Sequence, residues 1–551
     1  MKANSNEKTW DLQKQKRLKK LTAAKDKGLE KLVPNDRAVE LLETVIACAD
    51  KVCIEGNNQK QADFLSESLS ECDPEVLNEL HILQSVLALP SHIDIFEKGI
   101  ASKVDFSFAG PQALRLAKLV QNQQIKIGSI HTYLELYGRY FIDLIPNVCL
   151  ITAHSADADG NLYTGPNTED TPAIVEATAF KSGIVIAQVN ELVDSVPRVD
   201  IPADWVDFVI VAPKPNYIEP LFTRDPAQIT DVQILMAMMV IKGIYAPYQI
   251  KRLNHGIGFN TAAIELLLPT YGEELNLKGK ICTNWALNPH PTMIPAIESG
   301  FVESIHSFGS EVGMDDYIEG RPDIFFTGSD GNMRSNRAFS QTAGLYACDL
   351  FIGSTLQIDL QGNSSTATVD RIAGFGGAPN MGSDPHGRRH SSYGYLKAGQ
   401  EATDGRVIKG RKLVVQLVET FRENMNPVFV EELDAWQLQE KMGSDFPPIM
   451  IFGDDVTHIV TEEGIANLLL CRTPEDREQA IRGVAGYTAI GMARDHEKVK
   501  ELRQRGIIQR PEDLGIDISK ANRDLLAAKS VKDLVRWSNG TYAPPSRFRN
   551  W

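Results

Sequence analysis

The sequence lacks the usual signs of a secreted, membrane-spanning or nucleic-acid-binding protein. Its 551 residues carry a formal net charge of −15, whereas binding to nucleic-acid phosphates requires a basic surface. The N-terminal residues are charged and contain no apolar core of the kind that a secretion signal needs. The longest apolar stretch, residues 234–241, is too short to span a membrane. We therefore expect a cytoplasmic protein.

Cysteine is scarce, and its spacing argues against two common uses. The seven cysteines are odd in number and include no C-x-x-C pair, so neither a disulfide framework nor a zinc site is indicated. This pattern is typical of a reducing compartment. Gly-x-Ser-x-Gly, Walker and H-E-x-x-H motifs are also absent from the sequence, which disfavours serine hydrolases, nucleotide hydrolases and metalloproteases.

What is present predicts a large α/β protein. The length indicates two or three domains. Residues 205–212 read as a buried strand, and residues 171–181 have apolar positions at helical spacing. Strands that alternate with helices predict mainly parallel sheets, with ligands beyond the carboxyl ends of the strands.

The two halves of the sequence share landmarks in the same order. Three pairs of segments match, namely residues 52–56 with 251–258, residues 96–99 with 297–300, and Asp159-Gly160-Asn161 with Asp330-Gly331-Asn332. Extending the last pair without gaps, at an offset of 171 (331 − 160), places residues 184–189 on residues 355–360. Three landmarks in one order indicate an internal duplication. We predict an N-terminal helical extension at 1–35, a first domain at 36–224 and a second at 225–551.

The most unusual stretch is the glycine-rich segment 374–382. Its glycines allow close approach of the backbone to a ligand, and the N–H groups of Gly376, Gly377 and Ala378 could hold an oxyanion during acyl transfer. Arg388 and Arg389 could bind a carboxylate, and with Asn380 they form the predicted substrate site. A glycine segment of this kind, taken alone, is more often a surface turn.

Two further segments are candidates for chemistry. Residues 256–261 close a probable strand and open a helix, an arrangement that can bind phosphate or another anion, so Gly256, Gly258 and Asn260 are predicted ligand contacts. The third glycine of a dinucleotide fingerprint is missing, and the alternative is a tight turn. Glu311 lies on a Gly/Ser loop after a strand and could act as nucleophile or base, the alternative being a solvated glutamate.

A series of motifs in the second half resembles the CoA-transferase superfamily. The segments are Gln357-Ile358-Asp359-Leu360-Gln361-Gly362, Gly374-Phe375-Gly376-Gly377, and Val460-Thr461-Glu462-Glu463-Gly464-Ile465-Ala466-Asn467-Leu468. In that superfamily a "V-D-L-x-G" strand, a "G-x-G-G" oxyanion loop and a "V-T-E-x-G-I-A-x-L" segment follow one another. Nearly end to end, the chain looks most like the alpha-subunit family of malonate decarboxylases.

This resemblance implies two tandem CoA-transferase-like domains with a cleft between them, and an exchange of acids on a carrier thioester. Acetyl-S-carrier and malonate would give malonyl-S-carrier and acetate, and beta and gamma subunits would then decarboxylate the malonyl group. The carrier is implied to be a small acyl-carrier subunit whose prosthetic group is a phosphoribosyl-dephospho-CoA. No metal, nicotinamide or covalently bound cofactor is implied for this chain.

The resemblance also bears on the candidate residues. Gly256-Ile257-Gly258 matches a loop that contacts CoA in the superfamily, and Glu311 lies where many members carry a glutamate that forms a covalent thioester. The residues around Glu311 depart from the common pattern, and citrate-lyase-like relatives let the incoming carboxylate attack directly, so both routes stay open. The first half carries Gly56-Asn57-Asn58 in place of the Gly-x-Gly, which predicts a scaffold role there.

Three other activities remain compatible with the sequence. An acetate or citrate CoA-transferase would differ in the acid that it accepts. A non-catalytic CoA-binding scaffold subunit would need no oxyanion loop, so the glycine-rich segment counts against it. A thioester hydrolase would result if water took the place of the acid.

Overall fold

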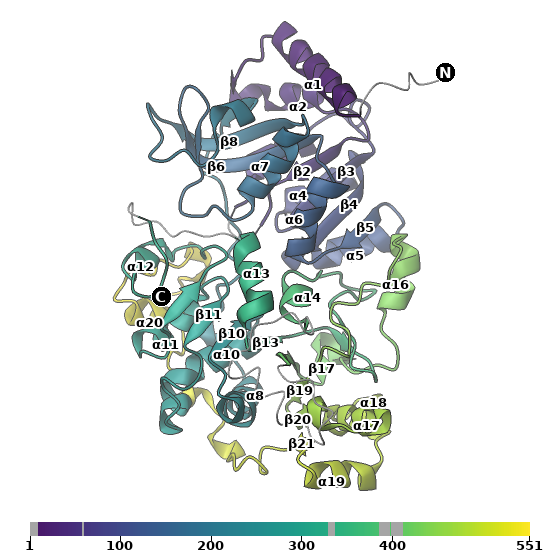
Figure 1. Cartoon of the computed structure of the whole chain (residues 1–551), viewed down its shortest axis with the longest axis vertical. Coiled ribbons are helices and arrows are strands. Elements are labelled where there is room, and N and C mark those ends of the chain that lie inside the picture. Colours follow the sequence, from purple (N-terminus) through teal and green to yellow (C-terminus); the bar gives the residue numbers. More distant parts are fainter. Residues whose placement is uncertain (1–8, 58–59, 329–336, 385–396, 398–410) are drawn as a thin grey trace. The chain divides into compact units, whose positions relative to one another are not determined.

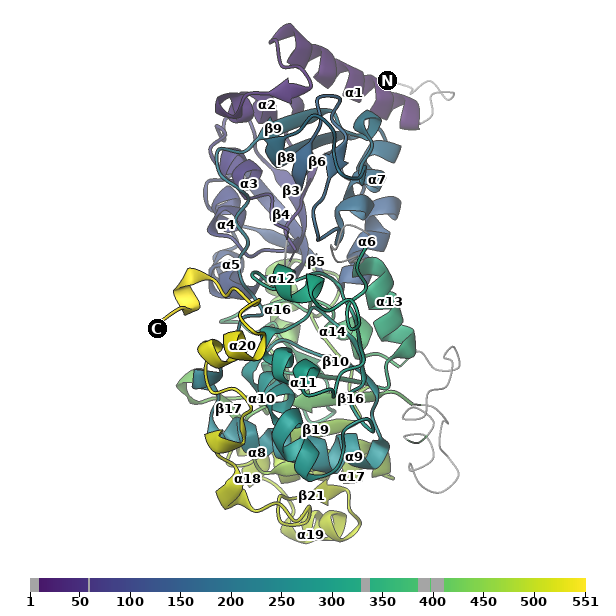
Figure 2. The ribbon, with the colours of Figure 1, turned by 90° about the vertical axis from the view of Figure 1, so that its left-hand side faces the viewer.

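The computed structural model describes residues 9–57, 60–328, 337–384, 397 and 411–551. These residues form two compact units (Figures 1 and 2). Unit 1 comprises Met1–Glu219, Val369–Gly376 and Gln437–Pro447, and unit 2 comprises Pro220–Thr368, Gly377–Trp436 and Pro448–Trp551. The chain thus passes from one unit to the other inside the glycine-rich segment.

Unit 1 is built on a sheet of nine strands in the order β1-β9-β8-β6-β2-β3-β4-β5, with β7 paired to β6. Every pairing is parallel except that of β6 with β7. The strands are β1 (Leu32–Val33), β2 (Lys51–Ile54), β3 (Leu80–Val86), β4 (Ala101–Phe108), β5 (Lys126–Ile130), β6 (Val148–Ala156), β7 (Leu162–Tyr163), β8 (Ile184–Leu192) and β9 (Phe208–Val211).

Helices cover this sheet, as its nearly continuous apolar strands require. All seven residues of β3 are buried. The helix predicted at 171–181 is confirmed as α7, and the strand predicted at 205–212 is confirmed as β9. The helices of unit 1 are α1 (Thr9–Asp26), α2 (Ala38–Val45), α3 (Asp63–Ser70), α4 (Pro90–Glu97), α5 (Ala113–Gln121), α6 (Tyr133–Ile142) and α7 (Thr171–Phe180).

Unit 2 contains a second sheet, of eight strands in the order β12-β11-β10-β13-β16-β19-β20-β21. It is parallel from β12 to β19 and antiparallel from β19 to β21. Two small hairpins, β14–β15 and β17–β18, stand apart from it. The strands are β10 (Arg252–His255), β11 (Asn284–Ala286), β12 (Ser304–His306), β13 (Leu350–Gly353), β14 (Gln357–Ile358), β15 (Ser364–Ser365), β16 (Leu413–Leu417), β17 (Phe421–Arg422), β18 (Asn426–Pro427), β19 (His458–Thr461), β20 (Gly464–Asn467) and β21 (Ile508–Gln509).

The apolar stretch at 234–241 forms the buried helix α8 and the turn that follows it. Thr230 and Gln233 form a capping box at its start, and residues Ile234 to Val240 are all buried. Within the part of the chain that the structure describes, no helix is long and apolar enough to cross a membrane. The main helices of unit 2 are α8 (Asp231–Val240), α9 (Ala246–Tyr248), α10 (Phe259–Leu267), α11 (Ile294–Glu298), α12 (Asp315–Glu319), α13 (Arg337–Ala347), α14 (Ala378–Met381), α17 (Pro474–Val484), α18 (Ala489–Met492), α19 (His496–Gln504) and α20 (Val531–Trp537), while α16 (Ala435–Met442) has residues in both units.

The strand order confirms the predicted duplication. Unit 1 contains the order β9-β8-β6-β2-β3-β4, and unit 2 contains the matching order β19-β16-β13-β10-β11-β12. Gly56 lies in the loop after β2 and Gly256 in the loop after β10, an offset of 200 (256 − 56). Gly99 and Gly300, which precede β4 and β12, give 201 (300 − 99), and both have positive φ.

The predicted offset of 171 is wrong. Residues 330–332 lie outside the described residues, and the structural partner of the segment from Asp157 to Asn161 is the segment from Asp359 to Asn363, at an offset of 202 (359 − 157). In each segment the aspartate accepts backbone N–H groups of the turn and the side chain of the asparagine at 2.9 Å. Three identical residues were too short a match to fix the alignment of two halves that contain insertions.

Candidate active site

The loop at 256–260 lies at the carboxyl ends of three adjacent strands in unit 2. Gly256 follows β10, and its N–H donates to the Ile352 carbonyl of β13 at 2.7 Å. The backbones approach so closely that a Cβ on Gly256 would lie 3.1 Å from the Gly353 Cα atom. Asn260 Nδ2 donates to the Leu417 carbonyl at the end of β16 at 3.3 Å. The predicted strand, loop and helix start are confirmed here.

The local sequence orders this loop at the start of a helix. Gly258 precedes α10, and Thr261 Oγ1 donates to the carbonyls of Gly256 and Gly258 at 2.7 and 3.1 Å. These bonds turn the loop carbonyls towards the helix. The first N–H groups of α10 lie at the N-terminus of the helix. The N-terminus of a helix favours phosphate and other anions. The assignment of Gly256, Gly258 and Asn260 as ligand contacts stays a prediction.

Glu311 lies in a cradle formed by residues next to the predicted domain boundary, which the sequence did not link to Glu311. Its Oε1 atom accepts the Thr223 N–H at 3.2 Å and the Thr223 hydroxyl at 2.9 Å, and its Oε2 atom accepts the Phe222 N–H at 3.3 Å. Only 1% of Glu311 is exposed. The predicted alternative, a solvated glutamate, is therefore wrong, because the carboxylate is buried and held by three donors.

The C-terminal segment of unit 2 fixes the loop that carries Glu311. Gly313 has φ +82°, and its carbonyl accepts the Ala543 N–H at 2.9 Å. A Cβ at Gly313 would lie 1.9 Å from the Ala543 carbonyl oxygen, so only glycine fits there. The neighbouring Tyr542 is buried, and burial raises the pKa of its hydroxyl.

A buried cluster of ionisable side chains lies behind the 256–260 loop. Glu265 Oε1 contacts Nδ1 of both His255 and His290 at 3.0 Å, and its other oxygen accepts the Thr292 hydroxyl. Burial opposes ionisation of Glu265, but His290 and His255 more than offset it and lower the pKa of Glu265 to about 2. Burial lowers the pKa of His255, whose Nε2 contacts the Tyr245 hydroxyl at 2.8 Å.

One aromatic contact joins this cluster to the cradle of Glu311. The Phe222 ring stacks on His290 with ring centroids 5.4 Å apart and planes 21° from parallel. Burial lowers the pKa of the nearby Arg224 guanidinium, against the attraction of Glu311 and Glu265. The position of Phe222, and with it one donor to Glu311, thus depends on the packing around Glu265.

The first part of the glycine-rich segment extends β4 of unit 1. Gly374 forms an antiparallel bridge with Phe108, and the Ser107 carbonyl accepts the N–H groups of Phe375 and Gly376 at 2.6 and 2.8 Å. Gly374 and Gly376 have φ of +76° and +59°, which explains the glycines. In this structure the N–H of Gly376 is therefore occupied by Ser107.

The second part of the segment belongs to unit 2. Gly377 precedes α14, and among the described residues neither its N–H nor that of Ala378 has a hydrogen-bond acceptor. Asn380 Nδ2 donates to the Gln341 carbonyl at 2.7 Å, which ties α14 to α13. Gly377 and Ala378 thus remain as adjacent N–H donors for an oxyanion.

The structure describes some of the predicted site residues, and it reveals others that the sequence analysis missed. Arg388 and Arg389 lie outside the described residues. No hydrogen bond joins Glu311 to the 256–260 loop or to Gly377 within the described ranges. The sequence did not reveal the contacts of Thr223 or the Glu265 cluster, since their partners are far away in the chain. A single glutamate in a mostly apolar helix was a signal that could have pointed to Glu265.

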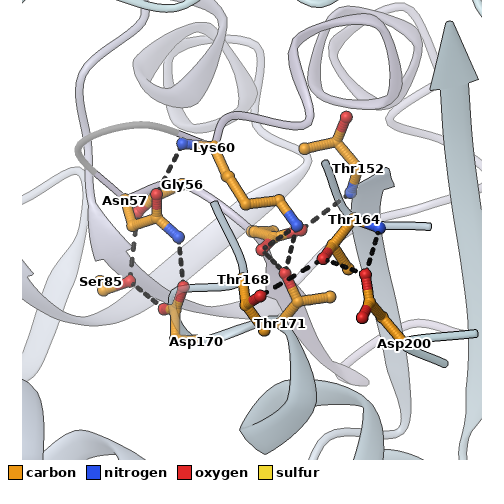
Figure 3. A network of polar contacts seen from close by, with 11 residues as sticks. Gly56, Asn57, Lys60, Ser85, Thr152, Thr164, Thr168, Asp170, Thr171 and Asp200 are labelled. Atoms are coloured by element: carbon orange, nitrogen blue, oxygen red, sulfur yellow. Dashed lines mark hydrogen bonds and ion pairs between the residues drawn. The ribbon is translucent and has the colours of Figure 1, made fainter. Parts of the chain in front are cut away.

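The first half carries its own polar network at the carboxyl end of β2 (Figure 3). Glu55 accepts the Thr152 N–H at 2.9 Å and the Thr171 hydroxyl, and Lys60 Nζ lies 3.6 Å from its Oε1 atom. Burial raises the pKa of Glu55 to about 7, although the Lys60 charge opposes this. A carboxylate and an ammonium group are thus buried together.

A second carboxylate extends this network. Asp170 accepts the Ser85 hydroxyl at 2.8 Å and the Asn57 amide, and Ser85 also reaches the Gly56 carbonyl at 3.2 Å (Figure 3). The Lys60 N–H donates to Asn57 Oδ1 at 2.7 Å. Side chains of unit 1 thus bind the described ends of the loop after β2.

Comparisons with known proteins point to one family. Residues 9–551 match the family "Malonate decarboxylase, alpha subunit, transporter". The acetyl-S-ACP:malonate ACP transferase of Malonomonas rubra is 62% identical over 551 residues, which are 99% of this chain and 100% of that protein. A crystal structure of a Pseudomonas malonate decarboxylase hetero-tetramer in complex with malonate contains a chain 56% identical to this one, with a TM-score of 0.94 and coverage of 99% and 100%.

A more distant likeness concerns the fold alone. An acyl-CoA transferase from Escherichia coli O157:H7 has 15% identity and a TM-score of 0.51, over 78% of this chain and 87% of that one. With the two related parallel sheets, this likeness confirms the predicted fold of tandem CoA-transferase-like domains.

Proposed function

The chain belongs to the malonate decarboxylase alpha-subunit family, and we propose that it exchanges acetate for malonate on a carrier thioester. Acetyl-S-carrier and malonate give malonyl-S-carrier and acetate, the first step of malonate decarboxylation. The observation that carries this proposal is the full-length relative at 62% identity, which is an acetyl-S-ACP:malonate ACP transferase. The alternative activities, acetate or citrate CoA-transferase, are not supported by a relative of comparable identity.

The reaction needs two acyl transfers through a mixed anhydride. A malonate carboxylate attacks the acetyl carbonyl, and the carrier thiolate leaves. The thiolate then attacks the malonyl carbonyl of the anhydride, and acetate leaves with the bridging oxygen. Each attack creates an oxyanion, for which the N–H groups of Gly377 and Ala378 are the proposed donors, each contributing about two or three orders of magnitude in rate. Gly376 joins them only if its bond to Ser107 opens.

We infer that malonate attacks directly rather than through Glu311. Three hydrogen bonds from Phe222 and Thr223 stabilise the ionised Glu311 carboxylate, and its burial keeps an acyl group at a distance. A carboxylate stabilised in this way is a weak nucleophile. Glu311 then positions the segment that leads into unit 2 and supplies a fixed negative charge.

The remaining predicted residues bind the two substrates. Gly256, Gly258 and Asn260 hold the phosphate-bearing prosthetic group of the carrier, a phosphoribosyl-dephospho-CoA, or a free CoA thioester. Asn380, through its contact with Gln341, orients α14 beside malonate. Arg388 and Arg389 bind the second carboxylate of malonate as charged donors.

The proposed partners are the acyl-carrier subunit and the beta and gamma decarboxylase subunits. A relative occurs in a hetero-tetramer, which supports a multi-subunit assembly. The seven cysteines are free in the structure, as expected in the cytoplasm, where we place the reaction.

Incubation of the purified chain with acetylated carrier and labelled malonate tests this function. Labelled malonyl-carrier is expected, with none formed from labelled citrate. Release of acetate without malonyl-carrier would identify a thioester hydrolase. If neither product forms even after the other subunits are added, the chain is a scaffold and the proposal is wrong.

A further inference from the structure

A groove with a basic lining lies at the amino ends of the strands of unit 1, the opposite end from the Glu55 network. Helix α1 crosses these strand ends (Figure 2). Arg17 Nε donates to the Gly183 carbonyl at 3.2 Å, and Lys20 Nζ lies 2.5 Å from Asp50 Oδ2. The groove beside α1 has a volume of about 620 Å³, within the range of small-molecule sites.

Positive charge exceeds negative charge along its walls. The charged residues that line it are six cations and two carboxylates, namely Lys16, Arg17, Lys19, Lys20, Lys51 and Lys181, with Asp50 and Asp143. Both carboxylates already have partners, since Asp50 pairs with Lys20 and Asp143 with Arg139 at 2.5 Å. Arg17 pairs with Asp207. The other cations are therefore not neutralised by the groove itself.

Four lysines carry this excess. Among the described residues, no carboxylate lies within 4 Å of Nζ of Lys16, Lys19, Lys51 or Lys181. Lys51 Nζ donates to the Asp143 carbonyl at 2.7 Å, and its charge also attracts the Asp143 carboxylate, so the excess rests mainly on the other three. The whole chain has a net charge of −15, so this concentration of lysines makes a locally positive site on an acidic protein.

Apolar residues complete the lining. Ile145, Pro146 and Ile184 lie on the wall formed by the strand starts. The half-buried Ile145 provides apolar surface for a ring, whereas Pro146 and Ile184 are buried. Lysine ammonium groups bind phosphate as point charges. A stable protein interface would need about 800 Å² on each partner, and a groove of about 620 Å³ fits a compact ligand better.

We propose that this groove binds a phosphate-bearing small molecule of nucleotide size. Lys16, Lys19 and Lys181 contact its phosphates, and Ile145 contacts its ring. The site lies within unit 1, and it is independent of the proposed transferase activity.

Calorimetry on the full chain with ATP, ADP and pyrophosphate, and with adenosine as the uncharged control, tests the proposal. At least one phosphate compound is expected to bind with a Kd below about 1 mM, and adenosine is not. The double variant Lys16→Glu/Lys19→Glu should weaken binding at least about tenfold. The matched variant Lys14→Glu/Lys25→Glu changes the same charge on α1 outside the groove and should change binding less than about twofold.

Cys48 gives a second readout, because it is exposed and lines the groove. A bound ligand should slow its alkylation, followed by mass spectrometry of the Cys48 peptide. Absence of binding by all three phosphate compounds would overturn the proposal, as would binding that survives the Lys16/Lys19 reversal. If only the partner subunits of the complex slow Cys48 alkylation, the groove is a subunit interface and the proposal is wrong.

Discussion

Strand β2 of unit 1 and strand β10 of unit 2 occupy the same place in two copies of one fold. A glutamate is buried near the carboxyl end of each, but the two pKa values are shifted in opposite directions. Glu55 lies beside one lysine, and burial raises its pKa to about 7. Glu265 contacts two histidines and a threonine, and its pKa falls to about 2. In unit 1 side chains bind the loop after the strand, whereas unit 2 has a Gly-x-Gly loop that leads directly into a helix.

This difference fits the predicted scaffold role of the first half. The network around Asp170 and Lys60 uses the polar groups of its loop internally, so they are engaged before any ligand arrives. Behind the 256–260 loop, the charge of Glu265 is held by His255 and His290 rather than by groups of the loop. The scaffold role of the first half stays a prediction. The following measurements compare the two buried glutamates and the loops beside them.

The largest effect is expected from Glu265→Gln. It removes a buried charge that three groups share, so the free energy of unfolding of unit 2 should fall by about 3–5 kcal/mol at pH 7. Glu55→Gln is the matched variant and should cost less than about 1 kcal/mol, because Glu55 has a pKa of about 7 and its burial already disfavours the ionised form at that pH. Urea unfolding followed separately in each unit compares them, and equal losses would refute the contrast.

Gly377→Pro should lower kcat by about 100- to 1,000-fold, because proline removes the N–H proposed as an oxyanion donor. The backbone can accept proline, since φ of Gly377 is −86°. Gly377→Ala keeps the N–H and is the control. The atom nearest to its Cβ would be Nε2 of Gln341, at 2.8 Å, the far end of a flexible side chain. A similar loss of kcat in both variants would show that shape, not the N–H, is what matters.

Stability should depend on pH through Glu55. Its pKa is raised from 4.5 in the unfolded chain to about 7, so the folded state binds more protons in this interval. The free energy of unfolding of unit 1 therefore falls as pH rises from about 4.5 to 7, by about 3 kcal/mol from this group. Glu55→Gln should flatten that part of the profile. Glu265 contributes the opposite slope, with stability lost as pH falls below 4.5 towards 2.

The smallest effect is expected at the Glu311 cradle. Thr223→Val removes the hydroxyl donor but keeps the N–H donor, and should lower kcat about tenfold by loosening Glu311. Thr223→Ser restores an O–H group and should recover most of the activity. An unchanged KM for malonate is expected in both variants, and a raised KM would place Thr223 in direct contact with malonate instead.

The sequence was enough for the alternating elements, the duplication and the glycine loops, because these depend on local periodicity and on residues close in the chain. It failed where a contact joins distant segments. The N–H of Gly376 looked available until Ser107, far upstream, was found to accept it. Thr223 gave no local sign that it holds Glu311. The offset of 171 failed because three residues cannot outweigh the strand order of a sheet.

The central claim, direct attack of malonate on the acetyl thioester, can be tested by a single turnover with malonate labelled with ¹⁸O in its carboxylates. The bridging oxygen of the mixed anhydride comes from malonate and leaves with acetate. We therefore predict that the acetate released in the first turnover carries one ¹⁸O atom and that Glu311 carries none. Unlabelled acetate together with ¹⁸O on the Glu311 peptide would contradict this account and establish a covalent glutamyl route.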